Sequence, residues 1–485
     1  MPEKQLPRRP SLVHLKYQAR DLLDAHKAGD AEAVARITPF LPSSPSLFHL
    51  SDAQFVVARE YGFESWSRLR AYVETVASHT CSPHKETVEP EAAADVFLRL
   101  ACLVYGNDHP SRREQAKQML AEQPGIRGAN LHVAAATGDL ETAQALLAAN
   151  PKLARERGGP NHWQPLLYLA YSRVGFESAN WLDTARLLLR HGADPNAAYL
   201  WEGSYLFTAL TGVFGEGEAG PVNLPEHPEC LPLAELLLRA GANPNDSQVL
   251  YNRQFVPGAR YLELLLEFGL GKPAKDAWSR RLSGRHLQSP SQMVADQLFL
   301  AASHGHRDRM ELLLDHGADP NLLNRQGRTP YELALLGGHP GIAELLLAHG
   351  AQRKDLAPLD AFAAACSRGD RTAALDLLRA DASLVGQLGS RQAEMLAAAA
   401  SGNHLEAMRV MADTGFDLNA MRHSTPLHEA AWNGHLEMVK LLIGRGADAT
   451  IRDRSHSGLP ADWAAHNHRH EVAAYLESLQ SSHQP

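Results

Sequence analysis

The feature that most constrains the fold is a short pattern that returns at a fixed interval. The dipeptide Gly305-His306 recurs 33 residues later as Gly338-His339, with apolar residues placed alike around both copies. Each copy is too short to bury its own apolar face, so neighbouring copies must stack and cover one another. The interval therefore predicts an array of repeated units, in place of a chain wrapped around one core.

One copy, residues 425–446, shows how a unit is built. Thr425 and Pro426 suit the start of a helix, because a hydroxyl can cap an unpaired N–H and proline has no N–H to leave unpaired. Gly434 suits a tight turn, because glycine takes a positive φ without steric cost. The apolar residues from Val439 onward give a second helix a stripe that only the next unit can cover. Each unit is thus predicted to be a helix-turn-helix pair.

This pattern resembles the ankyrin repeat. Residues 425–428 read Thr-Pro-Leu-His, Gly434 occupies the turn, and residues 446–448 read Gly-Ala-Asp. The resemblance implies an all-α fold, in which roughly ten helix-turn-helix units form a solenoid. It also implies that His428 hydrogen-bonds the turn of a neighbouring repeat.

Three parts are expected along the chain. Residues 1–78 lack the repeat and are predicted to form a small N-terminal helical domain, and residues 79–91, rich in proline and glutamate, a linker. The repeat array is expected over residues 92–481, with insertions near 213–230 and 272–292, where the spacing between units lengthens. The segment 52–66 is similar to a helical segment that precedes ankyrin repeats in some bacterial proteins, so the chain resembles that bacterial type.

Composition narrows the classes of function. The net charge of −8 and the pI near 6.3 give no general attraction to nucleic acid or to anionic membranes. We expect no signal peptide and no membrane span, and therefore a cytoplasmic protein that is a monomer. The four cysteines are far apart, and His468 stands where a repeat has its turn glycine, so His466, His468 and His470 cannot line one helix face. No metal site, cofactor or catalytic residue is predicted.

The candidate site is a protein-binding surface. Aromatic residues gather in the middle of the chain, and arginines with one tryptophan fall at the repeat positions that face partners in ankyrin proteins. Tryptophan, tyrosine and arginine are the residues that dominate the energetics of protein interfaces. The predicted partner-binding residues are Trp201, Tyr205, Arg325, Arg328, Arg422, Trp432, Asn433, Arg452 and Arg454.

The function expected from these patterns is recognition of a protein partner by a rigid, non-catalytic scaffold. The partner meets the concave face and the finger loops of the array. Two alternatives stay open. The chain can be a transcriptional or signalling regulator that uses its N-terminal helices, because Ala58 to Gly62 has helix-turn-helix spacing. It can also be an enzyme with a site in the central insertions.

Overall fold

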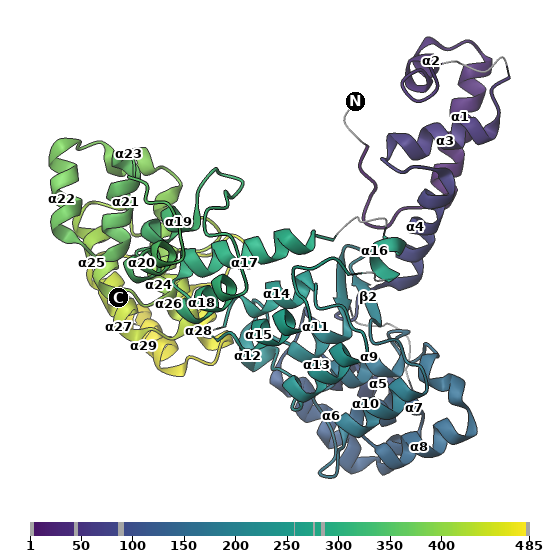
Figure 1. The fold of residues 1–485 in the computed structure, drawn as a ribbon. Coiled ribbons are helices and arrows are strands. Elements are labelled where there is room, and N and C mark those ends of the chain that lie inside the picture. Colours follow the sequence, from purple (N-terminus) through teal and green to yellow (C-terminus); the bar gives the residue numbers. More distant parts are fainter. Residues whose placement is uncertain are drawn as a thin grey trace. The chain divides into compact units, whose positions relative to one another are not determined.

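The computed structural model describes residues 4–42, 47–85, 92–256, 258–274, 277–282 and 287–481. Helices dominate it (Figure 1), and the all-α prediction is confirmed. The chain divides into two compact units, residues 1–293 and 294–485, and the long helix α17 (Pro290–His304) contains the division.

The first unit begins with four helices that carry no repeat pattern. They are α1 (Leu12–Lys27), α2 (Ala31–Ile37), α3 (Leu50–Glu60) and α4 (Trp66–His79). Ser11 caps α1 and Ser65 caps α4, because each hydroxyl accepts a backbone N–H from the first turn, at 3.3 Å in both cases. Their shared core also takes in Leu200 and Trp278 from far along the chain. The domain limit near residue 78 stays a prediction.

Helix pairs follow, as the repeat pattern predicted. Five pairs among the described residues of this unit are α5 (Ala93–Ala101) with α6 (Pro110–Glu122), α7 (Leu131–Thr137) with α8 (Leu140–Ala149), α9 (Pro165–Tyr171) with α10 (Trp181–Arg190), α11 (Ala209–Phe214) with α13 (Cys230–Arg239), and α14 (Ser247–Arg253) with α15 (Arg260–Glu267). Short elements accompany them: η1 (Pro124–Gly128) and η2 (Pro151–Arg155) lie between pairs, α12 (Gly220–Asn223) lies between α11 and α13, and α16 (Ala277–Arg281) follows α15. Both expected insertions thus contain a short helix.

A small three-stranded sheet is an addition that the repeat pattern did not predict. Its order is β1 (Thr80–Cys81), β2 (Ala198–Trp201) and β3 (Tyr205–Thr208). Strands β2 and β3 form an antiparallel hairpin, while β1 lies parallel to β2. The hairpin turn takes positive φ at Glu202 (51°) and Gly203 (76°). It connects α10 to α11, so it projects from the array as an enlarged finger loop, and β1 joins it to the N-terminal helices.

Most aromatic side chains of the first unit belong to its core. Trp163, Tyr168, Tyr171 and Tyr199 have no exposed surface, and Trp163 stacks on Tyr199 with ring centroids 4.6 Å apart. Aromatic rings bury large apolar areas, so a cluster of this kind stabilises repeats whose spacing is irregular. The concentration of aromatic residues in the middle of the sequence therefore marks packing at these four positions.

The second unit is a more regular array. Its described residues form six pairs: α17 with α18 (Arg307–Asp315), α19 (Pro330–Leu336) with α20 (Pro340–Ala348), α21 (Pro358–Arg368) with α22 (Arg371–Ala380), α24 (Arg391–Ser401) with α25 (Leu405–Asp413), α26 (Pro426–Asn433) with α27 (Leu436–Gly444), and α28 (Pro460–His466) with α29 (His470–Ser481); α23 (Leu384–Leu388) precedes α24. Leu396, Leu427 and Leu442 lie in one continuous core that crosses repeat boundaries. The stacking expected of a solenoid is therefore present.

Two turns in this unit confirm particular predictions. Gly434 ends α26 with φ of 77°, the left-handed conformation that glycine adopts most readily. His468 takes the equivalent turn position in the last repeat with φ of 58°. Its backbone is thus held in the turn, as the sequence comparison of the two repeats predicted.

Candidate partner-binding surface

A hydrogen bond from His428 joins two neighbouring repeats of the second unit. His428 Nδ1 accepts the backbone N–H of Thr425 at 3.2 Å, so Nε2 carries the proton and lies 3.2 Å from the carbonyl oxygen of Gly458 in the next turn. Burial lowers the pKa of His428, which keeps the ring neutral. The predicted role of His428 as a link between repeats is confirmed.

The finger loops on either side of α26 are also fixed to each other. The N–H of Arg454 donates to the carbonyl oxygen of His423 at 2.9 Å, and Asn419 Oδ1 accepts the N–H of Asp448 at 2.8 Å. Backbone and amide contacts of this kind hold both loops in one geometry before any partner arrives. A surface built on them loses little conformational entropy when it binds.

Asp453 organises the second of these loops. Its carboxylate accepts three backbone N–H groups at 2.7–2.8 Å and the indole N–H of Trp463 at 3.1 Å. Burial raises the pKa of Asp453, but these hydrogen bonds outweigh that effect and bring it down to about 2. The negative charge of Asp453 is therefore hydrogen-bonded within the loop, whereas Arg452 and Arg454 are exposed on the loop surface.

Three predicted arginines lie exposed on these two loops. Arg422 is on the first, where its nearest described carboxylate is Glu394 at 3.7 Å. Arg452 and Arg454 are on the second, and their side chains donate to the carbonyl oxygens of Ser457 (2.6 Å) and Arg422 (3.4 Å). The structure brings these three predicted residues together.

Trp432 and Asn433 lie at the end of α26 and are only half-exposed. The Trp432 ring stacks on His466 of the next repeat (5.8 Å between centroids, 23° between planes) and meets Trp463 edge-on at 5.7 Å. Asn433 donates to the carbonyl oxygen of Glu429 at 2.9 Å. Both side chains therefore pack on their own repeat or the next one, and each keeps part of its surface exposed.

The two remaining predicted arginines, Arg325 and Arg328, lie in different surroundings. Arg325 is exposed in the turn between α18 and α19. Arg328 forms a bidentate ion pair with Asp360 (2.8 and 3.2 Å), which Arg391 joins at 2.9 Å. Burial raises the pKa of Asp360, but the two guanidinium groups lower it by more than burial raises it. The pKa of Asp360 therefore lies below its usual value. Arg328 is thus engaged in a link between repeats.

Trp201 and Tyr205 belong to the first unit, at the end of the β2–β3 hairpin. Trp201 is half-buried: its indole N–H donates to the carbonyl oxygen of Val104 at 3.1 Å, and its ring lies 5.0 Å from that of His84. Tyr205 is half-exposed at 50%. Trp201 therefore anchors the hairpin to the first repeat, and Tyr205 presents its ring at the surface.

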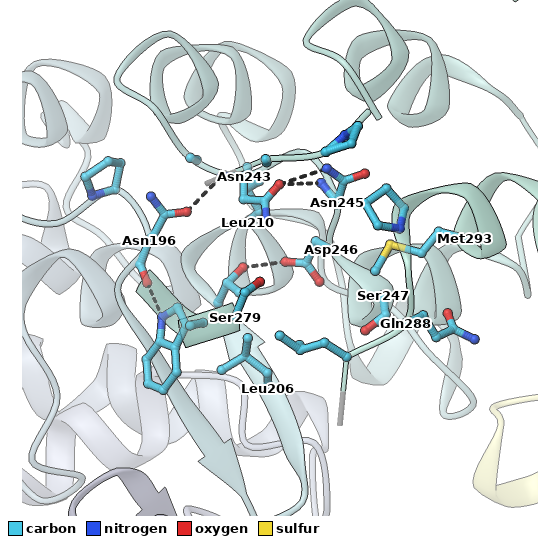
Figure 2. A pocket seen from close by; sticks show the side chains of 18 residues that line it. Asn196, Leu206, Leu210, Asn243, Asn245, Asp246, Ser247, Ser279, Gln288 and Met293 are labelled. Carbon is cyan, nitrogen blue, oxygen red and sulfur yellow. Dashed lines mark hydrogen bonds between the residues drawn. The ribbon is translucent and has the colours of Figure 1, made fainter. Parts of the chain in front are cut away.

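A pocket of about 170 Å³ lies in the central region where an enzyme site was considered (Figure 2). Asp246 accepts the hydroxyl of Thr208 at 2.5 Å and the backbone N–H groups of Gln248 and Val249, both at 3.0 Å. Asn196 Oδ1 accepts the N–H of Asn243 at 2.8 Å. Asp246 therefore caps helix α14, and Asn196 links two loops. Both are structural roles.

Among the residues that the structure describes, no three histidine, cysteine or acidic side chains are grouped so that they could hold a metal ion. Within the same residues, no helix combines the length and the apolar character needed to cross a bilayer.

Sequence reasoning missed Trp463 and Asp453 as parts of this surface. The Trp463 ring borders Trp432, and its indole N–H donates to the Asp453 carboxylate. A sequence signal was available only for the stacking of Trp432, because adding 34 to Trp432 gives His466, the ring it stacks on. Comparing equivalent positions of adjacent repeats would have paired these residues.

The fold and surface define a class: helical-hairpin repeat proteins whose turns form a continuous face. The comparisons with known proteins name the family. A model described as ankyrin repeats (3 copies) matches residues 288–356 and 362–453. Residues 288–356 and 362–453 therefore carry ankyrin repeats.

Several animal proteins are similar to parts of the chain. Ankyrin repeat and SOCS box protein 16 of Homo sapiens is 31% identical over 228 residues, which are 46% of this chain and 44% of that protein. Ankyrin repeat and KH domain-containing protein mask-1 of Caenorhabditis elegans is 32% identical over 154 residues, 30% of this chain and 6% of that protein. Cyclin-dependent kinase 4 inhibitor B of Mus musculus is 47% identical over 55 residues, 11% of this chain and 42% of that protein. The chain therefore spans less than half of each of these relatives, and the expected bacterial type stays a prediction.

Proposed function

We propose that this chain is a non-catalytic scaffold that binds a protein partner through the finger loops around α26. The observation that carries the proposal is the pair of loops joined by the Arg454–His423 backbone bond, which present Arg422, Arg452 and Arg454 to solvent. Arginine is enriched where proteins bind one another, and loops on a rigid framework commonly carry binding residues.

The charge of this surface indicates the chemistry of the partner. The carboxylate of Asp453 is hydrogen-bonded by the loop backbone, whereas the three arginines are exposed on the same loops. Complementary charge steers association and favours one partner over others. We therefore expect acidic side chains on the partner where it meets these loops. One relative's name, cyclin-dependent kinase 4 inhibitor B, describes a protein that acts on another protein, which agrees with this proposal.

Affinity capture with matched variants tests the proposal. The bait is the full chain, as wild type, as the double variant Arg422→Ala/Arg454→Ala, and as Lys440→Ala on the outer helix α27, where the lysine pairs only with Glu437 among the described residues. We expect a set of proteins recovered by wild type and by the Lys440 variant and lost with the double variant. The proposal is wrong if the double variant recovers the same proteins in the same amounts. The regulator alternative and the cytoplasmic location stay predictions from the sequence.

A further inference from the structure

A second surface lies in the first unit, where the insertion between α11 and α13 meets the β2–β3 hairpin and α14. Between residues 92 and 293, the described part of the chain leaves four large apolar side chains exposed: Tyr205 on β3 (50%), Val222 on α12 (40%), Tyr251 on α14 (44%) and Phe255 just after α14 (48%). Exposed apolar side chains that gather in one place commonly mark a binding surface.

The three aromatic rings of this set are neighbours. The rings of Tyr251 and Phe255 meet edge-on with centroids 5.4 Å apart. Strand β3, which carries Tyr205, contacts α14. Burial, the Glu218 carboxylate and, to a smaller extent, the Tyr205 phenol raise the pKa of Tyr251, so Tyr205 lies near Tyr251 as well. Tyr205, Tyr251 and Phe255 therefore form one exposed aromatic patch.

The elements that carry the aromatic patch are fixed to one another. Thr208 at the end of β3 donates its hydroxyl to Asp246 at 2.5 Å, and Asp246 caps α14. The Tyr251 hydroxyl donates to the Glu218 carboxylate, which joins α14 to the insertion. The rings are thus held in place before a partner arrives, so binding loses little conformational entropy.

The chain around the aromatic patch is acidic. Residues 191–238, which include the hairpin and the first insertion, contain seven aspartate and glutamate residues and no lysine or arginine. Opposite charges across an interface steer association and help to select the partner. The composition of this segment therefore favours a positively charged partner.

Ion pairs within the protein balance only part of this negative charge. Arg253 on α14 is shared by two carboxylates, those of Glu216 at 2.9 Å and Glu226 at 3.4 Å. Arg113 also reaches the insertion, but its guanidinium group donates to two backbone carbonyl oxygens, at 2.7 and 3.0 Å. Glu218 is exposed, and within the described ranges no lysine or arginine pairs with it. The carboxylates at this surface therefore outnumber the cations.

Aromatic rings and carboxylates together suit a guanidinium group. The ring faces of tyrosine and phenylalanine attract cations, and arginine does this more often than lysine. The planar guanidinium group stacks on a ring and can also donate two parallel hydrogen bonds to a carboxylate. A surface that offers both kinds of contact side by side therefore matches arginine better than any other side chain.

We propose that this surface binds a segment of a partner protein that carries arginine side chains, which lie on the aromatic patch and pair with Glu218. Its preference for charge is opposite to that of the loops around α26, which expose arginines and belong to the second unit. The two surfaces therefore recognise different chemistry, and this proposal does not depend on the proposed function of those loops.

Fluorescence anisotropy tests the proposal with a labelled peptide of alternating arginine and glycine, titrated with the full chain at physiological ionic strength. We expect saturable binding of this peptide. A second peptide carries citrulline in place of every arginine, which keeps the shape of the side chain and removes its charge. It should bind about ten-fold more weakly or less, because charged donors make the stronger hydrogen bonds to carboxylates.

Variants of the aromatic patch locate the binding. Tyr251→Ala/Phe255→Ala should weaken binding of the arginine peptide by about ten-fold or more, because both ring faces are lost. Tyr251→Phe keeps the ring and should bind within about two-fold of the wild type. The matched control is Val13→Ala/Tyr17→Ala on α1, which truncates two side chains that are 60% and 56% exposed, and it should leave binding unchanged.

A second pair of variants separates the local carboxylate from the overall charge of the chain. Glu218→Gln should weaken binding by about three-fold, as expected for one exposed ion pair. Glu437→Gln on α27 removes the same charge from a side chain that is 70% exposed, and it should bind like the wild type.

Three results would overturn the proposal. They are equal affinity for the arginine and citrulline peptides, full affinity in the Tyr251→Ala/Phe255→Ala variant, and equal weakening by Glu218→Gln and Glu437→Gln. Thermal unfolding of each variant accompanies the titrations. If the double alanine variant melts at a lower temperature, Glu218→Gln and its control decide the result, because both glutamates can be replaced at the surface without unfolding the chain.

Discussion

Arg173 offers a sharp test of how the central repeats are held together. The residue is 8% exposed, and its guanidinium group donates to four backbone carbonyl oxygens: Gly212 at 2.6 Å, Pro225 at 2.7 Å, Ser172 at 2.8 Å and Ala170 at 3.1 Å. Two of these carbonyls border the insertion between α11 and α13. Burial lowers the pKa of Arg173 to about 10, so the charge itself is costly to keep inside.

Substitution of Arg173 by methionine keeps most of the volume and removes every donor. An unsatisfied buried carbonyl costs about 1–3 kcal/mol, and the insertion carbonyls of Gly212 and Pro225 would lose this donor together. Methionine also removes the desolvation penalty of the buried charge, which offsets part of this loss of stability. We therefore expect the free energy of unfolding of the first unit to fall by about 2–4 kcal/mol.

Urea unfolding followed by tryptophan fluorescence measures this loss, because five of the seven tryptophans lie in residues 1–293. The matched control is Arg186→Met on α10, where the side chain is 50% exposed and pairs with Asp183, whose side chain is 46% exposed. The control should unfold like the wild type, since exposed ion pairs contribute little. If Arg173→Met unfolds no more easily than the control, the four hydrogen bonds do not stabilise the insertion and the reasoning is refuted.

Two further predictions concern the second unit. Burial lowers the pKa of His306 to about 4 and the pKa of His339 below its usual value, so both rings are neutral in the folded protein. Protonation of these rings favours the unfolded chain, whose histidines have a pKa near 6.5. The folded second unit should therefore be fully stable above about pH 6.5 and lose stability as the pH falls toward 4. Melting temperatures from pH 7.5 to 4.5 check this, and His339→Gln should flatten the profile; an equal fall in both proteins would contradict it. Gly434→Ala should destabilise by about 1–2 kcal/mol, since φ is 77° and the new methyl would lie 2.8 Å from Arg469 Cδ. The control is Gly444→Ala on helix α27, where the new methyl meets no atom within 4 Å. In the same urea titration this variant should be as stable as the wild type or more stable by about 1 kcal/mol. If Gly444→Ala is instead the less stable of the two variants, the turn at Gly434 is not strained.

The regular half of this fold was predictable because its signals are local. A turn glycine, a helix-starting Thr-Pro and an apolar stripe lie within one repeat, and the linking role of His428 follows from the same pattern. The small sheet was not predictable in this way. Its first strand, Thr80–Cys81, pairs with residues far along the chain, and its hairpin lies where the repeat spacing lengthens.

The surface was predicted only in part, for a physical reason. A tryptophan at a partner-facing position has the same sequence pattern whether it faces solvent or stacks on the next repeat. Trp432 stacks on His466, and Trp201 donates its N–H to Val104, so both serve packing as well as surface. Arginines were easier, because a loop position with few apolar neighbours leaves the guanidinium in water, as at Arg422, Arg452 and Arg454. Arg328 is the exception, since Asp360 comes from a separate repeat.

Photo-cross-linking in the native cell extract tests the central claim most directly, namely that a protein docks on the loops around α26. A photoreactive amino acid is placed at Arg422, at Arg454, or at Lys440 on the outer helix, in the otherwise unchanged chain. The account predicts the same covalent adduct from positions 422 and 454 and none from position 440. Adducts from position 440 alone, or equal adducts from all three, would contradict it.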